Sequence, residues 1–201
     1  MMVNNETSER ADTVAVTDPA ALPALPGGIL SPKELRLWVA ELAGRAELWE
    51  PLVGHDSGRR HYASLYRDSD IDVWVLCWNV RDDTGWHDHD VSSGAVAVTR
   101  GAVTESNLRM NGVPVTRVVP AGRTFAFGPD HIHRMGGAVD GSVSIHAYSP
   151  PLWRMGQYSI SANGVMRRQA VSYADELRPL DGIDLVAEER GLQAAAEGVG
   201  Q

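Results

Sequence analysis

The sequence contains almost no cysteine and no excess of positive charge. Cys77 is the only cysteine among 201 residues, so no disulfide can form within the chain, and a disulfide-stabilised secreted scaffold is excluded. The 18 Lys and Arg residues are outnumbered by 26 Asp and Glu residues, which gives a formal net charge of −8. This balance argues against sequence-independent binding to nucleic acid and against docking on anionic membranes.

Long hydrophobic runs are also missing. No apolar segment approaches membrane-spanning length, and the N-terminus lacks a basic region followed by an apolar one. We therefore expect a cytoplasmic protein with no membrane partner and no nucleic-acid partner. The chain is long enough for one domain with a core. We expect a disordered N-terminal arm over residues 1–28, one domain over residues 29–183 and a C-terminal tail over residues 184–201.

A helix start is encoded directly after the proposed arm. Ser31 suits the N-cap, Pro32 suits the first turn, and Glu34 completes a capping box. Apolar residues then recur at helical spacing up to Pro51, which predicts one amphipathic helix packed against the rest of the domain. These residues are Leu35, Trp38, Val39, Leu42, Ala46 and Trp49.

Beyond residue 60 the sequence predicts short β-strands separated by turns. Runs rich in β-branched and aromatic residues indicate strands at 71–78, 94–99, 103–108, 115–119, 124–127, 143–148, 158–161 and 165–171. Asn-Gly pairs begin at Asn111 and Asn163 and favour hairpin turns between strands. No helices alternate with these strands, so we expect an all-β sandwich or barrel with an N-terminal helix.

Histidines cluster in the strand-rich half of the chain. His87 and His89 form one His-x-His pair, His131 and His133 form a second, and His146 stands alone. On a strand, residues two apart share a face, so each pair can present two imidazoles to one metal ion. A single pair is most simply a chance occurrence near a turn. Two pairs on strands of one barrel favour a metal site.

The first pair belongs to a segment that resembles the first motif of the cupins, in which His-x-His is followed by a Glu and then a Gly. Gly94 takes the place of the Glu, and Gly101 follows at the motif's spacing. The segment from Phe127 to His133 resembles a compressed second cupin motif. The resemblance implies a cupin fold, a double-stranded β-helix or jelly-roll barrel.

A further segment narrows the resemblance to one cupin family. Residues 144–151 read Ser-Ile-His-Ala-Tyr-Ser-Pro-Pro, and this is similar to the Ser-x-His-x-Tyr-Ser-Pro-Pro segment of the thiol dioxygenases, the cysteine dioxygenase family. The resemblance covers residues 60–155. It implies Fe(II) held by His87, His89 and His133, with a small thiol and O2 as substrates and a sulfinic acid as product. It also implies a monomer.

The same resemblance assigns roles to the residues around the metal. Tyr148 is the phenol beside the thiolate and the oxygen, and His146 and Ser144 hold it, while His131 is structural. Some relatives crosslink a cysteine to this tyrosine, but Gly94 stands at that position and cannot form the bond. Cys77 is expected to be a buried strand residue.

The sequence does not decide which thiol is the substrate. Relatives that oxidise cysteine or 3-mercaptopropionate hold the carboxylate with an arginine before the 71–78 strand. Alignment on Tyr66-Arg67 puts Tyr62 at that position, alignment on Cys77-Trp78 puts His61 there, and Arg60 shares the strand parity of Tyr62. Tyr62, Arg60, Trp78 and Trp153 are the expected substrate-binding residues. A tyrosine facing the iron favours a larger thiol such as ergothioneine, whose cation would bind aromatic faces, with cysteine the close alternative.

Two other functions fit a histidine cluster. A non-enzymatic metal-binding cupin would explain both His-x-His pairs, but it would not explain Ser144, His146 and Tyr148 in one strand. A three-histidine zinc hydrolase would need a general base beside the metal. Asp88 and Asp90 are the only adjacent carboxylates, and Asp88 alternates away from the histidine face.

Overall fold

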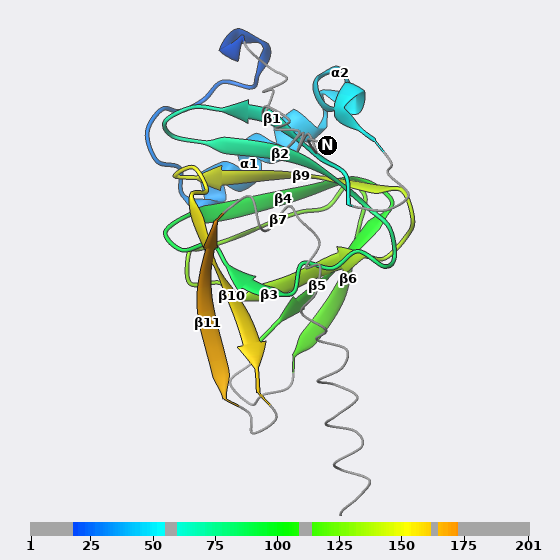
Figure 1. Cartoon of the computed structure of the whole chain (residues 1–201). Coiled ribbons are helices and arrows are strands. Elements are labelled where there is room, and N and C mark those ends of the chain that lie inside the picture. Colours follow the sequence, from blue (N-terminus) through cyan, green and yellow to red (C-terminus); the bar gives the residue numbers. More distant parts are fainter. Residues whose placement is uncertain (1–17, 55–59, 109–113, 162–164, 173–201) are drawn as a thin grey trace, which may run out of the picture.

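The computed structural model describes residues 18–54, 60–108, 114–161 and 165–172, which form two antiparallel sheets below a short helical layer (Figure 1). The five-stranded sheet has the order β1-β2-β9-β4-β7, and the six-stranded sheet has the order β11-β10-β3-β8-β5-β6. The strands are β1 (Tyr62–Arg67), β2 (Asp72–Trp78), β3 (Trp86–Asp88), β4 (Ser93–Arg100), β5 (Ala102–Asn107), β6 (Val115–Pro120), β7 (Thr124–Phe127), β8 (His133–Gly137), β9 (Ser142–Ser149), β10 (Arg154–Ile160) and β11 (Met166–Ser172).

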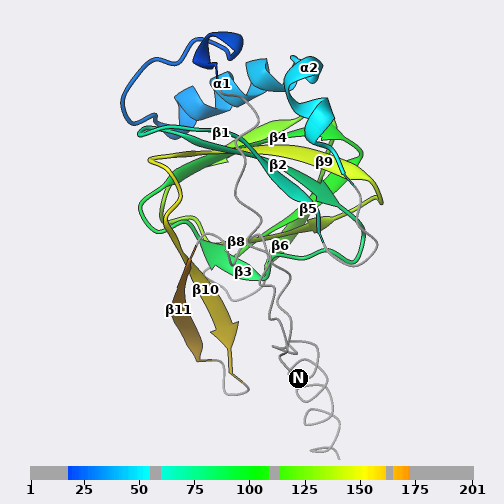
Figure 2. The same ribbon diagram turned by 45° about the horizontal axis from the view of Figure 1, so that its top comes forward.

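The helical layer confirms the encoded helix start. In α1 (Pro32–Ala43) the Ser31 hydroxyl accepts from the Glu34 amide, and the Glu34 carboxylate accepts from the Ser31 amide. The predicted helix is broken at Gly44 and Arg45, and α2 (Ala46–Trp49) follows as a separate turn. Figure 2 shows α1 lying across the outer face of the five-stranded sheet. Short 3₁₀ turns, Pro19–Ala21 and Glu50–Leu52, flank this layer.

Each strand of the five-stranded sheet contributes to two apolar layers. On β2, Val73, Val75 and Cys77 pack toward α1, whereas Trp74, Leu76 and Trp78 pack between the two sheets. The same alternation on β9 sends Ile145 toward α1 and Tyr148 between the sheets. Strand parity therefore decides which side chains reach the interior of the barrel.

The segment before α1 is more closely packed than its composition predicts. Residues 1–17 lie outside the described part of the chain, but Leu22 and Leu30 are buried in the layer beneath α1. The Trp38 Nε1 donates to the Pro23 carbonyl, and the Gly28 amide donates to Asp70. Two isolated leucines carry no periodic signal, so the sequence analysis missed these contacts. Both Asn-Gly pairs, at Asn111 and Asn163, and the tail over 184–201 lie outside the described residues.

The strands that the sequence analysis did not predict are β1, β3 and β8. They are short or interrupted by charged residues and glycines, and β1 has a register shift between Ser64 and Tyr66. Among the described residues, none forms a helix with the length and hydrophobicity that crossing a membrane requires.

Candidate metal centre

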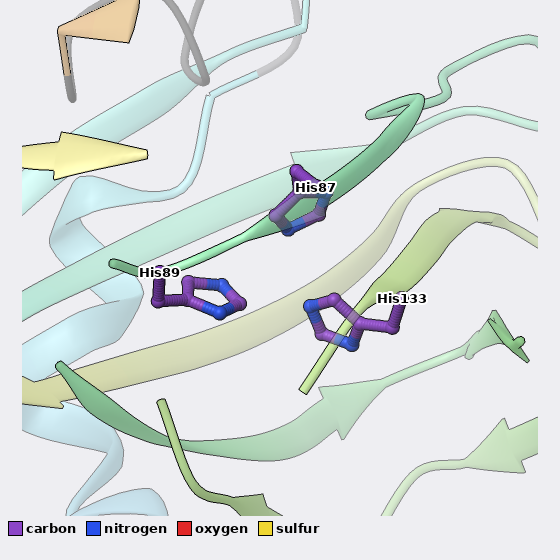
Figure 3. A group of neighbouring side chains, drawn as sticks. All are labelled: His87, His89 and His133. Atoms are coloured by element: carbon purple, nitrogen blue, oxygen red, sulfur yellow. The ribbon is translucent and has the colours of Figure 1, made fainter. Parts of the chain in front are cut away.

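Three buried histidines meet between the sheets. His87 lies on β3, His89 follows that strand directly, and His133 opens β8, where it pairs with His87 across the ladder. The ring centroids are 4.9 Å apart for His87 and His89, 4.6 Å for His87 and His133, and 5.1 Å for His89 and His133. One nitrogen of each ring lies within 4.8 Å of those of the other two. Figure 3 shows the rings turned toward a common point.

The hydrogen bonds of these rings leave nitrogens available to a metal. The His87 Nδ1 is 3.0 Å from the Gly85 carbonyl, and the His133 Nδ1 is 3.3 Å from Glu105 Oε1, so each Nδ1 donates and each Nε2 keeps its lone pair. The His133 Nε2 and both nitrogens of His89 are buried without a hydrogen-bond partner among the described residues. An unpaired buried polar atom is costly, and a bound cation would satisfy the His133 Nε2 and one nitrogen of His89. The residues therefore fit a metal ion.

Burial keeps the three imidazoles neutral. It lowers the pKa of His87 and His89 well below the ordinary histidine value, and the neighbouring histidines lower it further. Burial also lowers the pKa of His133, although the hydrogen bond to Glu105 opposes this. Neutral imidazoles are the form in which histidine binds metals.

Glu105, on β5, is a residue of this site that the sequence analysis missed. Its carboxylate is buried and accepts from His133, from His131 and from Arg117, whose Nη2 lies 2.6 Å away. Burial raises the pKa of Glu105, but these donors outweigh it and hold the pKa well below its usual range. The sequence signal for it is weak: Glu105 shares strand parity with the apolar Val103, so a charged residue falls on a face that could be buried.

Glu105, His131 and His133 are themselves close enough to hold a metal. Their facing atoms are already joined by hydrogen bonds, and Arg117 supplies the balancing charge, so this set fits an orienting network better than a cation site. His131 lies before β8, not on it, and stacks on Phe127 at 5.1 Å.

A second group of polar side chains follows alternate positions of β9. The Ser144 Oγ is 2.9 Å from the His146 Nε2, and the His146 Nδ1 is 3.2 Å from the Tyr148 hydroxyl. The Trp78 Nε1 donates to Ser144 at 2.8 Å. All four residues are buried, and burial together with the nearby His133 ring and the Arg60 guanidinium lowers the pKa of His146 to about 3. The Tyr148 ring stacks on His89 at 5.2 Å, so this chain of hydrogen bonds ends beside the histidine cluster.

Gly94 lies opposite Tyr148 in the ladder between β4 and β9. The space that a Cβ at Gly94 would need is filled by the Phe127 ring. That ring contacts His89 and His133, with centroids 4.6 Å and 4.7 Å away. Some relatives carry a crosslinking cysteine at this position. In this chain the Phe127 ring fills the space that such a side chain would need.

The expected substrate-binding residues divide between interior and surface. Arg60 is buried, its guanidinium lies 4.9 Å from the Trp78 ring centroid, and its charge contributes to the lowered pKa of His87 and His146. Tyr62 is half-buried and packs against Trp74, with ring centroids 6.1 Å apart. Trp153 is 64% exposed and lies beneath the Arg67 guanidinium.

Two further residues from the sequence analysis lie away from the histidine cluster. The His61 Nε2 is 3.0 Å from the Leu52 carbonyl, on the helical side of β1. Cys77 is buried in the layer beneath α1, where burial raises the pKa of its thiol.

Comparison with solved structures finds distant likenesses. A protein named KdgF from Halomonas sp. is 16% identical, with a TM-score of 0.41 over 48% of this chain and 85% of that one. A double-stranded beta-helix protein from Klebsiella pneumoniae is 12% identical, with a TM-score of 0.44 over 59% and 91% of the two chains. An RmlC-like cupin from Desulfovibrio desulfuricans is 13% identical, with a TM-score of 0.42 over 49% and 90%.

The sequence comparison is more specific. The sequence model of cysteine dioxygenase type I matches residues 38–161, from the middle of α1 to just beyond β10, and the match includes all the histidines of the site. The two antiparallel sheets confirm the mostly-β architecture that the sequence predicts. The match covers more than half of the chain, and the chain therefore belongs to the cysteine dioxygenase type I family of dioxygenases.

Proposed function

We propose that this protein is a mononuclear non-haem Fe(II) thiol dioxygenase that adds both atoms of O2 to the sulfur of a small thiol and releases a sulfinic acid. The observation that carries the proposal is the convergence of three buried neutral histidines beside Tyr148. In this reaction O2 accepts all the electrons that sulfur loses, so no external reductant is required. Family membership supports the same reaction class.

His87, His89 and His133 are the proposed iron ligands. Bound there, Fe(II) would supply a Lewis acid for the thiolate and an adjacent position for O2. These three ligands include no carboxylate, so the net charge of the site would equal that of the ion until the thiolate binds. An anionic ligand from the protein would compete with the thiolate for that charge.

Ser144, His146 and Tyr148 are proposed to set the direction of the tyrosine hydroxyl. Trp78 can only donate to Ser144, so the Ser144 proton is available to the His146 Nε2. The Nδ1–H of a neutral His146 then donates to Tyr148, which turns the phenol proton away from His146. Because the Tyr148 ring stacks on His89, that proton is directed toward the reacting sulfur and oxygen atoms.

The position of Arg60 supports a thiol that carries a carboxylate. Its guanidinium is buried on the same side of β2 as Trp78, and its charge acts on His87 and His146. A buried guanidinium binds a carboxylate strongly and repels a second cation. We therefore propose cysteine or 3-mercaptopropionate as the substrate ahead of ergothioneine, whose trimethylammonium group would lie near this charge. Tyr62 and Trp78 would flank the carbon chain.

Oxygen consumption tests the proposal. The protein is loaded with Fe(II) without oxygen and then mixed with aerated cysteine, 3-mercaptopropionate, cysteamine or ergothioneine. We expect uptake with a carboxylate-bearing thiol and a product heavier by two oxygen atoms. Uptake with ergothioneine alone would overturn the role of Arg60. Full iron occupancy without uptake for any thiol would overturn the dioxygenase assignment and favour a metal-binding cupin.

A further inference from the structure

Asp88 separates the two histidines of the first His-x-His pair and points away from them. Its carboxylate accepts from the Gly156 amide on β10, at 3.0 Å, and from the Tyr158 hydroxyl on the same strand. It also accepts from both the Nε and Nη2 of Arg168 on β11, at 2.7 Å and 2.8 Å. The bidentate arrangement is the strongest and most directional form of the arginine–carboxylate pair.

The same carboxylate organises the turn that follows His89. The Asp90 amide donates to Asp88 Oδ1 at 2.9 Å, and Asp90 adopts a left-handed backbone with φ of 54°. Aspartate tolerates this conformation better than most residues. Arg168 reaches Asp90 as well, at 3.3 Å. Asp88 thus holds the backbone on both sides of His89.

The neighbouring strand is shaped for this contact. Gly156 lies opposite Asp88, and the space for a Cβ there is occupied by the Arg168 guanidinium and the Asp88 carboxylate. Any other residue at this position would separate the two side chains. The close approach of three strands therefore depends on a residue without a side chain.

Arg168 lies beyond the residues that the family model matches, which end at 161. The hairpin of β10 and β11 projects from the barrel in both views (Figures 1 and 2). The side chains of β11 are exposed except for Val171, which is half-buried. Arg168 nevertheless joins this exposed strand to the strand that carries His87, through its ion pair with Asp88.

We propose that Arg168 is a positioning residue for the metal centre, acting through Asp88 to fix the backbone between His87 and His89. The inference rests on the proposed function, because it concerns the same metal ligands. A ligand pair held rigidly needs little reorganisation to bind a metal, whereas a loose pair must be ordered when the metal binds. The C-terminal hairpin thereby contributes to metal affinity without contacting the metal.

The test compares Arg168→Met with Arg167→Met in the full chain. Arg167 is the adjacent residue of β11 and is exposed, so the control removes the same charge from the same strand. Fe(II) and Co(II) affinities are measured by competition with a chelator, and the absorption bands of bound Co(II) report ligand geometry. We expect Arg168→Met to weaken both affinities by about 10-fold and to change the Co(II) spectrum. Arg167→Met should leave both as in the wild type.

Two further variants allow the inference to be tested even if Arg168→Met does not fold. Arg168→Lys keeps the charge but cannot form the bidentate pair, and we expect it to restore only part of the affinity. If Arg168→Met does not fold, Tyr158→Phe removes one donor from Asp88 and should still shift the Co(II) spectrum. Wild-type affinities and spectra in the folded variants would overturn the inference. Wild-type protein that binds Co(II) as expected but oxidises no thiol would overturn the proposed function and leave the positioning role standing.

Discussion

Glu105 Oε1 lies 3.3 Å from the Nδ1 of His133, and both side chains are buried. The carboxylate fixes the ring in the form whose Nε2 faces His87 and His89. It also places a negative charge behind one ligand of a site that has no carboxylate of its own, which makes that imidazole a better donor to a cation. Arg117 limits this effect by pairing with the other carboxylate oxygen.

Replacing Glu105 tests this relationship. Glu105→Gln keeps the size of the side chain but removes its charge, so we expect the affinity for Fe(II) to fall by about 10-fold or more, as measured by competition with a chelator. Glu50→Gln is the matched control, because the Glu50 carboxylate is exposed and pairs with Arg100 at the surface. Equal affinities for Glu105→Gln and the wild type would show that the carboxylate does not tune His133.

The two histidines of the second pair should differ in their effects. His133→Ala removes a proposed ligand and should abolish stoichiometric iron binding. His131→Ala removes a partly exposed ring that contacts Glu105 and Phe127, and iron should stay bound. Iron content after desalting distinguishes the two variants. Stoichiometric iron in His133→Ala would refute the ligand assignment.

Tyr148→Phe should separate turnover from iron binding. The variant keeps the ring that stacks on His89 and loses only the hydroxyl that His146 holds. We expect kcat to fall by about 100-fold with iron content unchanged. Tyr66→Phe is the control, since the Tyr66 hydroxyl bonds to Asp68 and its ring packs beneath α1. An unchanged kcat would remove the Tyr148 hydroxyl from the reaction.

Arg60→Met tests the recognition of a carboxylate. Loss of a charge-assisted hydrogen-bond pair should raise KM for cysteine or 3-mercaptopropionate by about 10- to 100-fold. KM for cysteamine, which has no carboxylate, should change little. Arg45→Met removes a surface arginine of the helical layer and serves as the control variant. A parallel change in KM for all thiols would indicate that Arg60 supports the fold and not the substrate.

The buried histidines predict how the stability of the metal-free protein depends on pH. Burial lowers the pKa of His87, His89, His133 and His146 in the folded state, the last to about 3. Unfolding restores ordinary values near 6.5, so below about pH 6.5 the unfolded chain binds more protons than the folded one. As far as these histidines are concerned, the free energy of unfolding is therefore highest above about pH 6.5. It decreases as the pH falls toward the pKa values of the folded state.

Urea denaturation at a series of pH values measures this effect. We expect the free energy of unfolding to decrease below about pH 6.5, by at most about 1.4 kcal/mol per pH unit for each histidine. His146→Asn should reduce that slope by the share of one histidine. A free energy of unfolding that is constant between about pH 6.5 and pH 4.5 would contradict the low pKa values.

The sequence was sufficient to predict most of the strands and the types of residue that gather at the site. The strand that carries Ser144, His146 and Tyr148 was predicted, because β-branched residues alternate with these polar ones. The capping box at Ser31 and Glu34 was predicted from a local pattern. Short strands such as β3 and β8 were missed, because pairing with neighbours stabilises them and their own composition does not.

What the sequence by itself determined is local: the helix start, the strands that correspond to β2 and β9, and the two His-x-His pairs. Tertiary structure alone decided that Arg60 is buried beside Trp78, that Phe127 fills the space opposite Tyr148, and that Glu105 reaches His133. It also decided that Arg168 meets Asp88 across 80 positions of sequence. Periodicity reports which face of a strand a residue occupies, whereas the partner it meets there depends on the register of strands that are distant in the chain.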